Sequence, residues 1–306
     1  MLFDLVIIGG GPAGVAAGVY ASRKKIKTLF IAKNFEGQST VSSEIQNWIG
    51  TIKISGAELS KNLENHLLAY KNDVIDIKKE LVENIVKKDS IFEIKTDKDN
   101  YQAKTILVSS GSKRKKLEIP GAEKYEGKGV VYCATCDGPL FTDKDVVVIG
   151  GGNAGFESVL QLLAYAKSVT LLQRSDKFRA DEITIKNISK NPKFKAILNA
   201  KISEIKGDNF VKSIVYKNPK TGEEKEIQTE GVFIEIGSIP TTDIVKDLVN
   251  LDDYRAIIVD HMTQKTSLEG IWAAGDCTNG LYKQNNIAVG DGIKALENIH
   301  QWLQNH

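Results

Sequence analysis

The sequence predicts an α/β fold of two similar units, and two copies of one pattern lead to this prediction. Residues 4–14 read DLVIIGGGPAG and residues 145–155 read DVVVIGGGNAG, an offset of 141 residues. Each copy is an apolar, β-branched run that is too short for a helix and ends in glycines. A helix-forming stretch and a second apolar run follow, at 12–24 and 27–32 in the first copy and at 154–166 and 168–173 in the second. A repeated strand–turn–helix–strand unit indicates two α/β domains.

The glycines of each copy have the spacing of a dinucleotide-binding turn. The pattern G-x-G-x-x-G is matched by Gly9, Gly11 and Gly14, and again by Gly150, Gly152 and Gly155. The first glycine permits a tight turn, the second lets a pyrophosphate approach the backbone, and the third lets helix and strand pack closely. The helix N-terminus then offers free N–H groups to the phosphates. One such turn can be purely structural, but two in this context predict two Rossmann-like sites.

Basic residues follow the second unit at the distance where a ribose contact is expected. Arg174 lies 19 residues beyond Gly155, where an NAD-specific site presents Asp or Glu. Together with Arg179 it favours a 2′-phosphate, because guanidinium groups bind phosphate through charge-assisted hydrogen bonds. NADPH is therefore expected rather than NADH. The alternative is a solvated charged loop, since Asp176 lies in the same segment.

Composition excludes several classes of protein. The 306 residues carry 41 basic and 39 acidic side chains, which gives no case for a nucleic-acid binder. Residues 5–21 lack charge, but Asp4 precedes them and glycines interrupt them, so they do not resemble a signal peptide. No apolar run is long enough to span a bilayer. With three cysteines and no export signal, we expect a reducing cytoplasm.

Residues 131–141, VYCATCDGPLF, place two of the three cysteines three residues apart. Zinc requires four ligands, and neither the isolated Cys277 nor the four histidines have suitable spacing, so no metal is predicted. An inert buried pair remains an alternative, although Gly138-Pro139 indicates a surface turn. A redox dithiol fits best, because a C-x-x-C pair closes a small, reducible ring and commonly has a lowered thiol pKa.

Taken together, these motifs resemble the low-molecular-weight thioredoxin reductases, a family of FAD-dependent disulfide reductases. The resemblance rests on IIGGGPAG, YCATCDGPLF and VIGGGNAGFES, and on RSDKFRAD, WAAGDC and QNNIAVGDG further along the chain. It implies a discontinuous FAD domain at 1–113 and 244–306, with an NADPH domain at 114–243 that carries the C-x-x-C pair. It also implies a homodimer and a thioredoxin-like protein as substrate.

The family resemblance assigns the site residues. Cys136 is expected to face the flavin, Cys133 to attack the substrate disulfide, and Asp137 to carry a proton. FAD is expected at Gly9, Gly11, Pro12, Ala13, Gly14, Gly37, Gln38, Asn47, Gly111, Gly275, Asp276, Lys283, Gln284, Asn285 and Ala288. NADPH is expected at Gly150, Gly152, Asn153, Ala154, Gly155, Glu157, Arg174 and Arg179.

Two rival functions stay open. Gln173 replaces a cation of the usual family pattern. An NADH-dependent reductase of a glutaredoxin-like or peroxiredoxin-linked partner, similar to the flavoprotein module of alkyl hydroperoxide reductase, is therefore one alternative. We expect no thioredoxin-like domain ahead of the first strand. The other alternative is a redox-silent flavin-binding protein, which an intact C-x-x-C pair disfavours.

Overall fold

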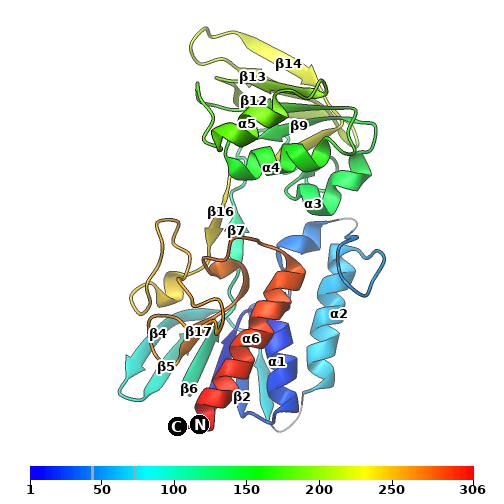
Figure 1. Ribbon diagram of the computed structural model, residues 1–306. Helices are drawn as coiled ribbons and strands as arrows, with labels where there is room; N and C mark the ends of the chain where they lie inside the picture. The colour runs from blue at the N-terminus through cyan, green and yellow to red at the C-terminus, as the bar shows by residue number, and fades with distance from the viewer. Residues whose placement is uncertain (43–44, 72–73) are drawn as a thin grey trace. The chain divides into compact units, whose positions relative to one another are not determined.

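A computed structural model describes residues 1–42, 45–71 and 74–306 of the chain (Figure 1). Its internal contacts divide the chain into two compact units, each described here by itself. The first contains Met1–Thr40, Ala57–Lys113 and Ile239–His306, and the second contains Val41–Gly56 and Arg114–Ser238. The predicted domain ranges differ from this division at residues 41–56 and 239–243. The assignment of one cofactor to each unit stays a prediction.

A mixed sheet forms the centre of the first unit. Its strands, in pairing order, are β3 (Ile75–Lys78), β2 (Thr28–Ile31), β1 (Leu2–Ile8), β6 (Asn100–Val108), β5 (Ile91–Thr96) and β4 (Val82–Lys88), and β17 (Ile271–Ala273) also pairs with β6. The pairs among β1, β2, β3, β6 and β17 are parallel, while β4 and β5 join as antiparallel strands. Leu5 and Ile7 of β1 are fully buried, as expected for a parallel strand covered on both faces.

The helices of the first unit are α1 (Pro12–Arg23), α2 (Gly56–Ala69) and α6 (Asn285–Leu303). Figure 1 shows α1 and α6 side by side, and their buried faces enclose Phe30, Trp272 and Leu296. The two helices approach closely because α6 has Gly292 at the contact, where a Cβ atom would overlap the carbonyl oxygen of Ala13. Short 3₁₀ turns lie at Gln38–Val41, Asp243–Val245 and Gly275–Cys277.

A parallel sheet forms the centre of the second unit. Its pairing order is β11 (Phe194–Ile197), β10 (Ser168–Leu172), β9 (Asp145–Ile149), β15 (Gly231–Ile234) and β8 (Val130–Val131). The chain passes from β9 through α4 (Asn153–Leu162) to β10 and β11 on one side, whereas β15 lies on the other side of β9. The carboxyl ends of β9 and β15 therefore flank a topological switch point, the usual ligand position in such sheets.

Both faces of this second sheet are buried. Val146 and Val148 pack with Phe156 and Val159 of α4 on one face, as part of a cluster that includes Ile188 of α5 (Glu182–Ile188). The opposite face packs against the antiparallel strands β12 (Lys201–Gly207), β13 (Val211–Lys217) and β14 (Glu224–Gln228). The remaining elements are α3 (Ala134–Asp137) and a 3₁₀ turn at Gly138–Phe141.

The predicted elements of the two copies form, with one difference. Helix α4 ends at Leu162, whereas the sequence pattern extends to residue 166. The N–H groups of Tyr165 and Ala166 both bond to the carbonyl of Leu162, so the chain turns there before β10 begins. The chain passes between the units through β7 (Ser112–Arg114) and β16 (Ser238–Pro240), which pair with each other. Within the described parts of the chain, no helix is both long and apolar enough to cross a bilayer.

The contact of α6 with α1 gives a prediction. Replacement of Gly292 by Ala should lower the free energy of unfolding by about 1–3 kcal/mol, because the added methyl group forces the helices apart at Ala13. The matched control is Gly290→Ala in the same helix, where a Cβ atom meets nothing within 4 Å. The control should be neutral or stabilising by up to about 1 kcal/mol. Thermal unfolding of both variants tests this, and equal midpoints would contradict it.

Candidate functional site

The first glycine motif forms a tight turn between β1 and α1. Gly9 has a φ of 119°, and a Cβ atom there would overlap the carbonyl oxygen of Ser109. A Cβ atom on Gly14 would overlap the carbonyl oxygen of Gly9, so the helix start can lie against the strand end only with glycine. Gly11 is different, since a Cβ atom there would meet nothing within 4 Å. Space is thus left beside the backbone at the second glycine.

The second motif repeats this geometry between β9 and α4. Gly150 has a φ of 121°, and its added Cβ atom would overlap the carbonyl oxygen of Glu235, which directly follows β15. That of Gly155 would overlap the carbonyl oxygen of Gly150, while Gly152 faces open space. Asn153 begins the helix, and its side-chain oxygen accepts a hydrogen bond from Asp181 N at 3.0 Å. Ala154 and Glu157, the other predicted contacts on α4, are exposed.

Both turns have the features that a pyrophosphate needs. The cap residues Gly11 and Gly152 have no side-chain oxygen, so no side chain of the cap satisfies the first N–H groups of α1 and α4. Those N–H groups and the helix dipole favour an anion. The open position at each second glycine leaves room for it. The residues present therefore fit a dinucleotide at each turn.

Part of the predicted FAD set gathers around the first turn. Gly275 has a φ of 76°, and an added Cβ atom would lie 3.2 Å from Ala13 Cβ and 3.4 Å from Ala288 Cβ. The three positions thus bring the starts of α1 and α6 together with the Gly275–Cys277 turn. Pro12 is the first residue of α1, where its fixed φ suits a helix start.

A second part of the set is joined by side-chain hydrogen bonds. Gln38 Nε2 donates to Asp276 Oδ2 at 3.2 Å and to Ser112 Oγ at 2.8 Å. Ser39 and Asn285 bond to each other at 3.0 and 3.2 Å, and Lys283 Nζ donates to the carbonyl of Thr278 at 2.6 Å. These bonds hold the turn at Gln38–Val41 against the residues that begin α6.

The remaining predicted FAD residues are placed less closely. Gly111 has a φ of 67°, and its carbonyl accepts a hydrogen bond from Thr241 N at 2.9 Å. Gly37 is exposed, and Gln284 is the cap residue of α6. Asn47 belongs to the second unit, whereas the other members of the set belong to the first. The structure therefore does not bring Asn47 together with them within one unit.

Cys133 and Cys136 form a disulfide at the start of α3, with their Cα atoms 5.3 Å apart. Cys133 is the cap residue of this helix, and its sulfur accepts a hydrogen bond from Cys136 N at 3.1 Å. Both cysteines are partly exposed. A hydrogen bond to sulfur stabilises a thiolate, so in the reduced state the geometry favours ionisation of Cys133. The third cysteine, Cys277, is buried in the first unit and is not in a disulfide.

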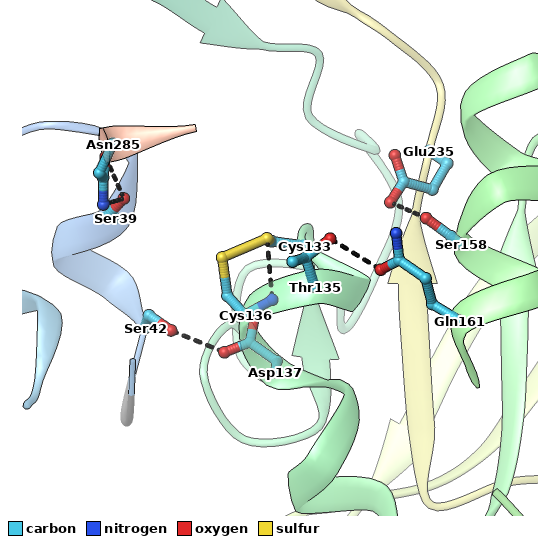
Figure 2. Close-up of a disulfide and its surroundings, with 10 residues drawn as sticks. All are labelled: Ser39, Ser42, Cys133, Thr135, Cys136, Asp137, Ser158, Gln161, Glu235 and Asn285. Carbon is cyan, nitrogen blue, oxygen red and sulfur yellow. Dashed lines mark hydrogen bonds between the residues drawn. A yellow bond between two sulfur atoms is a disulfide. The ribbon is translucent and has the colours of Figure 1, made fainter. Parts of the chain in front are cut away.

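Asp137 follows the disulfide directly and is buried, with 4% of its surface exposed. Figure 2 shows its carboxyl group pointing towards Ser42, whose hydroxyl donates to Asp137 Oδ1 at 2.6 Å. Burial raises the pKa of Asp137, while the bond from Ser42 and the charge of Arg114 lower it less, so the net shift is upward. A raised pKa lets this carboxyl hold a proton at a higher pH than an exposed aspartate.

The helix that follows the second turn also contacts the disulfide segment. Thr135 Oγ1, on α3, donates to Gln161 Oε1, on α4, at 2.7 Å. Ser158 lies one helical turn before Gln161, on the same face of α4, and its hydroxyl donates to Glu235 Oε1 at 2.6 Å. In Figure 2 these two pairs extend from α4 beside the disulfide. The nucleotide turn and the disulfide are thus parts of one hydrogen-bonded structure.

The expected 2′-phosphate edge lies at the end of β10. Arg174 is exposed and Arg179 partly exposed, and Arg179 N donates to the carbonyl of Gly151 at 2.7 Å, which places this loop beside the glycine turn. Gln173 is buried, with its Oε1 atom accepting from Gly151 N at 3.1 Å and its Nε2 atom donating to Ser175 Oγ at 2.7 Å. Gln173 therefore holds the loop in place instead of supplying charge.

Some residues of the site were not identified from sequence. Ser42, Gln161 and Glu235 each lie far along the chain from the group that they contact, and serine and glutamine have no motif of their own. Glu235 did give a signal, because it is an acid at the end of the apolar run GVFIEIG. Within the described residues, no group of three or more His, Cys, Asp or Glu side chains has a metal-binding arrangement.

Residues 3–292 match the family model described as pyridine nucleotide-disulphide oxidoreductase. The chain is 38% identical to a protein named NADH dehydrogenase from Bacillus subtilis and 40% identical to a component of alkyl hydroperoxide reductase, named AhpF-type by its letter F, from Pseudomonas aeruginosa. The matches cover 98% and 96% of this chain but only 58% and 57% of those relatives. A thioredoxin reductase from Mycolicibacterium smegmatis is 35% identical over 98% of this chain and 96% of its own length.

Solved structures match the whole chain. Thioredoxin reductase from Streptococcus pyogenes has a TM-score of 0.89 at 35% identity and covers 100% of this chain and 99% of its own. Thioredoxin reductase from Giardia duodenalis has a TM-score of 0.92 at 32% identity, with 99% of both chains covered. The matches confirm the predicted α/β fold class with two nucleotide-binding domains, the predicted resemblance and the predicted cofactors, FAD and NADPH.

Proposed function

The chain belongs to the pyridine nucleotide-disulphide oxidoreductase family, and we propose that it acts within this family as a thioredoxin reductase. In this function two electrons pass from NADPH, by way of FAD and the Cys133–Cys136 pair, to the disulfide of thioredoxin or a thioredoxin-like protein. The relatives and structures named thioredoxin reductase match this chain over nearly their whole length, which supports this choice over the longer relatives.

One observation carries the proposal. The Cys133–Cys136 disulfide lies in the same unit as the second glycine turn, and it is followed by a buried carboxyl group with a raised pKa. A partly exposed disulfide beside a proton-carrying group is suited to thiol–disulfide exchange. A redox-silent flavin-binding protein would have no use for this arrangement.

The residues that would hold the cofactors follow from the fit of the two turns. Gly9, Gly11 and Gly14, with Gln38, Asp276 and the start of α6, would hold FAD. Gly150, Gly152 and Gly155, with Glu157, Arg174 and Arg179, would hold NADPH. When bound, these groups supply the hydride and electron transfer that protein side chains lack. The remaining chemistry belongs to the dithiol and its neighbours.

Exchange with the protein substrate uses both sulfurs of the reduced pair. Cys133 thiolate attacks one sulfur of the substrate disulfide, and the other substrate sulfur leaves as a thiolate. Cys136 thiolate then attacks Cys133, breaks the mixed disulfide and releases the second substrate thiolate. The substrate gains two electrons, and the Cys133–Cys136 disulfide forms again. The roles of the two cysteines follow the family resemblance, and the hydrogen bond from Cys136 N to Cys133 Sγ supports Cys133 as the attacking thiolate.

Asp137 would move the protons of this exchange. Each released thiolate takes up a proton, and each attacking thiol loses one, so a carboxyl group with a raised pKa is useful here. Burial gives Asp137 this property, and Ser42 fixes the orientation of its carboxyl group. A homodimer and a cytoplasmic location also belong to this proposal, and light scattering and cell fractionation test them.

The NADH-dependent alternative is favoured by one feature of the second unit. Gln173 gives the nucleotide edge no charge, and relatives named NADH dehydrogenase and alkyl hydroperoxide reductase match the chain. In that case the substrate would be a glutaredoxin-like or peroxiredoxin-linked protein. Comparison of the two nucleotides decides between these functions.

Substitution of single cysteines tests the proposed electron path. Cys133→Ser and Cys136→Ser should each lower NADPH-dependent reduction of thioredoxin to background, because one sulfur cannot complete the exchange. Asp137→Asn should lower the rate by about 100-fold or more, as loss of a general acid–base does. Cys277→Ser is the matched control and should stay active, since its hydroxyl can donate to the same carbonyl oxygens of Val108 and Ala274. Activity that survives in Cys136→Ser would overturn the mechanism.

Substitution of the arginines tests the nucleotide preference. The wild-type protein should have a higher kcat/KM for NADPH than for NADH. Arg174→Ala and Arg179→Ala should each lower kcat/KM for NADPH by about 10–100-fold and leave that for NADH nearly unchanged, because a hydrogen bond to a charged group contributes about 1.5–3 kcal/mol. Arg23→Ala, an exposed arginine of the first unit, is the control. A wild-type preference for NADH would support the alternative function.

A further inference from the structure

Glu235 occupies a central place in the second unit that the mechanism does not use. It directly follows β15, and its N–H group donates to the carbonyl of Ile149 on β9 at 2.8 Å. Ile234 pairs with Ile149, so Glu235 lies opposite Gly150, the first residue of the glycine turn. On its other side, β15 pairs with β8, which leads directly into Tyr132 and Cys133. Glu235 is thus at the carboxyl edge of the sheet, on the strand between the one that leads to the nucleotide turn and the one that leads to the disulfide.

The side chain of Glu235 is held in this position. Ser158, which is 6% exposed, donates its hydroxyl hydrogen to Glu235 Oε1 at 2.6 Å (Figure 2). A Cβ atom on Gly155 would lie 3.9 Å from Glu235 Cβ, so the residue packs against the helix start that faces the dinucleotide. The carboxyl group therefore has a fixed place beside the switch point of the sheet, where a dinucleotide binds.

The charges around Glu235 make an ionised carboxylate costly there. Burial raises the pKa of Glu235 to about 7, and the charge of Glu157 on α4 raises it as well. The hydrogen bond from Ser158 and the charge of Arg114 on β7 act in the opposite direction but do not cancel the effect of burial. Strand β9 ends on Ile149 and Gly150, which do not titrate. Near pH 7 the carboxyl group is therefore shared between its protonated and ionised forms.

A bound dinucleotide adds further negative charge at this edge. Its pyrophosphate is anionic, and a carboxylate beside it would be repelled, whereas a protonated carboxyl group would not. The protonated form also has an O–H group that can donate a hydrogen bond. We propose that this unit binds its pyridine nucleotide together with a proton, which is carried by the carboxyl group of Glu235. The inference rests on the proposed function in that it requires a nucleotide at the second turn.

The sign of the effect follows from linkage. If the nucleotide raises the pKa of Glu235, binding takes up protons at a pH near the pKa of the free protein, and affinity falls as pH rises. With a free-state pKa of about 7 and a rise of about one pH unit on binding, affinity should be about fivefold weaker at pH 8 than at pH 6. NADP⁺ suits the measurement, because it binds the oxidised protein without reducing it.

The experiment is calorimetric titration of the oxidised, flavin-containing protein with NADP⁺, in buffers of different ionisation enthalpy and at several pH values. The wild type should take up more protons per bound nucleotide than Glu235→Gln near pH 7, and its affinity should depend more strongly on pH. This difference between the two proteins removes the contribution of the 2′-phosphate, which also titrates near this pH. Glu230→Gln, an exposed glutamate just before the same strand, is the matched control and should behave as the wild type.

A second variant tests the same proposal through the pKa of the group. Ser158→Ala removes a hydrogen bond that lowers the pKa of Glu235, so the pH of greatest proton uptake should move upward. This result does not depend on the stability of Glu235→Gln. Equal proton uptake by wild type and Glu235→Gln, or an unmoved pH in Ser158→Ala, would overturn the inference while leaving the proposed function intact. Failure of the wild type to bind NADP⁺ at all would instead overturn the proposed function and this inference with it.

Discussion

The close approach of a helix start to a strand end is the constraint on which both units depend. In each unit the third glycine of the motif lies against the carbonyl oxygen of the first, at Gly14 with Gly9 and at Gly155 with Gly150. Any side chain there would push the helix away from the sheet. The open second glycine and the uncapped N–H groups of the helix then follow from the same geometry. Because the helix begins so near the sheet, its free N–H groups lie at the carboxyl edge, where the other site residues also gather.

Buried carboxyl groups distinguish the second unit. Asp137 and Glu235 follow the disulfide and the strand β15, and burial raises the pKa of both. Each accepts a hydrogen bond from a serine hydroxyl, and the charge of Arg114 acts on both. These partners lower the cost of ionisation but do not remove it. The unit thereby keeps proton-carrying groups close to a dithiol and a nucleotide, both of which change charge during the reaction.

Local features of the fold and the site were accessible from sequence, and long-range ones were not. The glycine turns and the C-x-x-C pair are short motifs whose spacing carries their geometry, so they were predicted correctly as turns and as a vicinal pair. The partners of the two carboxyl groups were missed, because Ser42 and Asp137 are 95 residues apart and Ser158 and Glu235 are 77 apart. Gln173 was recognised only as a lost cation, since its bond to Gly151 N depends on how the loop folds back.

The central claim is that the Cys133–Cys136 disulfide exchanges electrons with a flavin bound to the same chain. The most direct measurement is the number of electrons that the purified, flavin-containing protein accepts in an anaerobic titration with dithionite, followed by the absorbance of the flavin. Flavin and disulfide together accept four electrons per chain, which is the result that this account predicts. Uptake of only two electrons would mean that the disulfide is not connected to the flavin, and it would contradict the account.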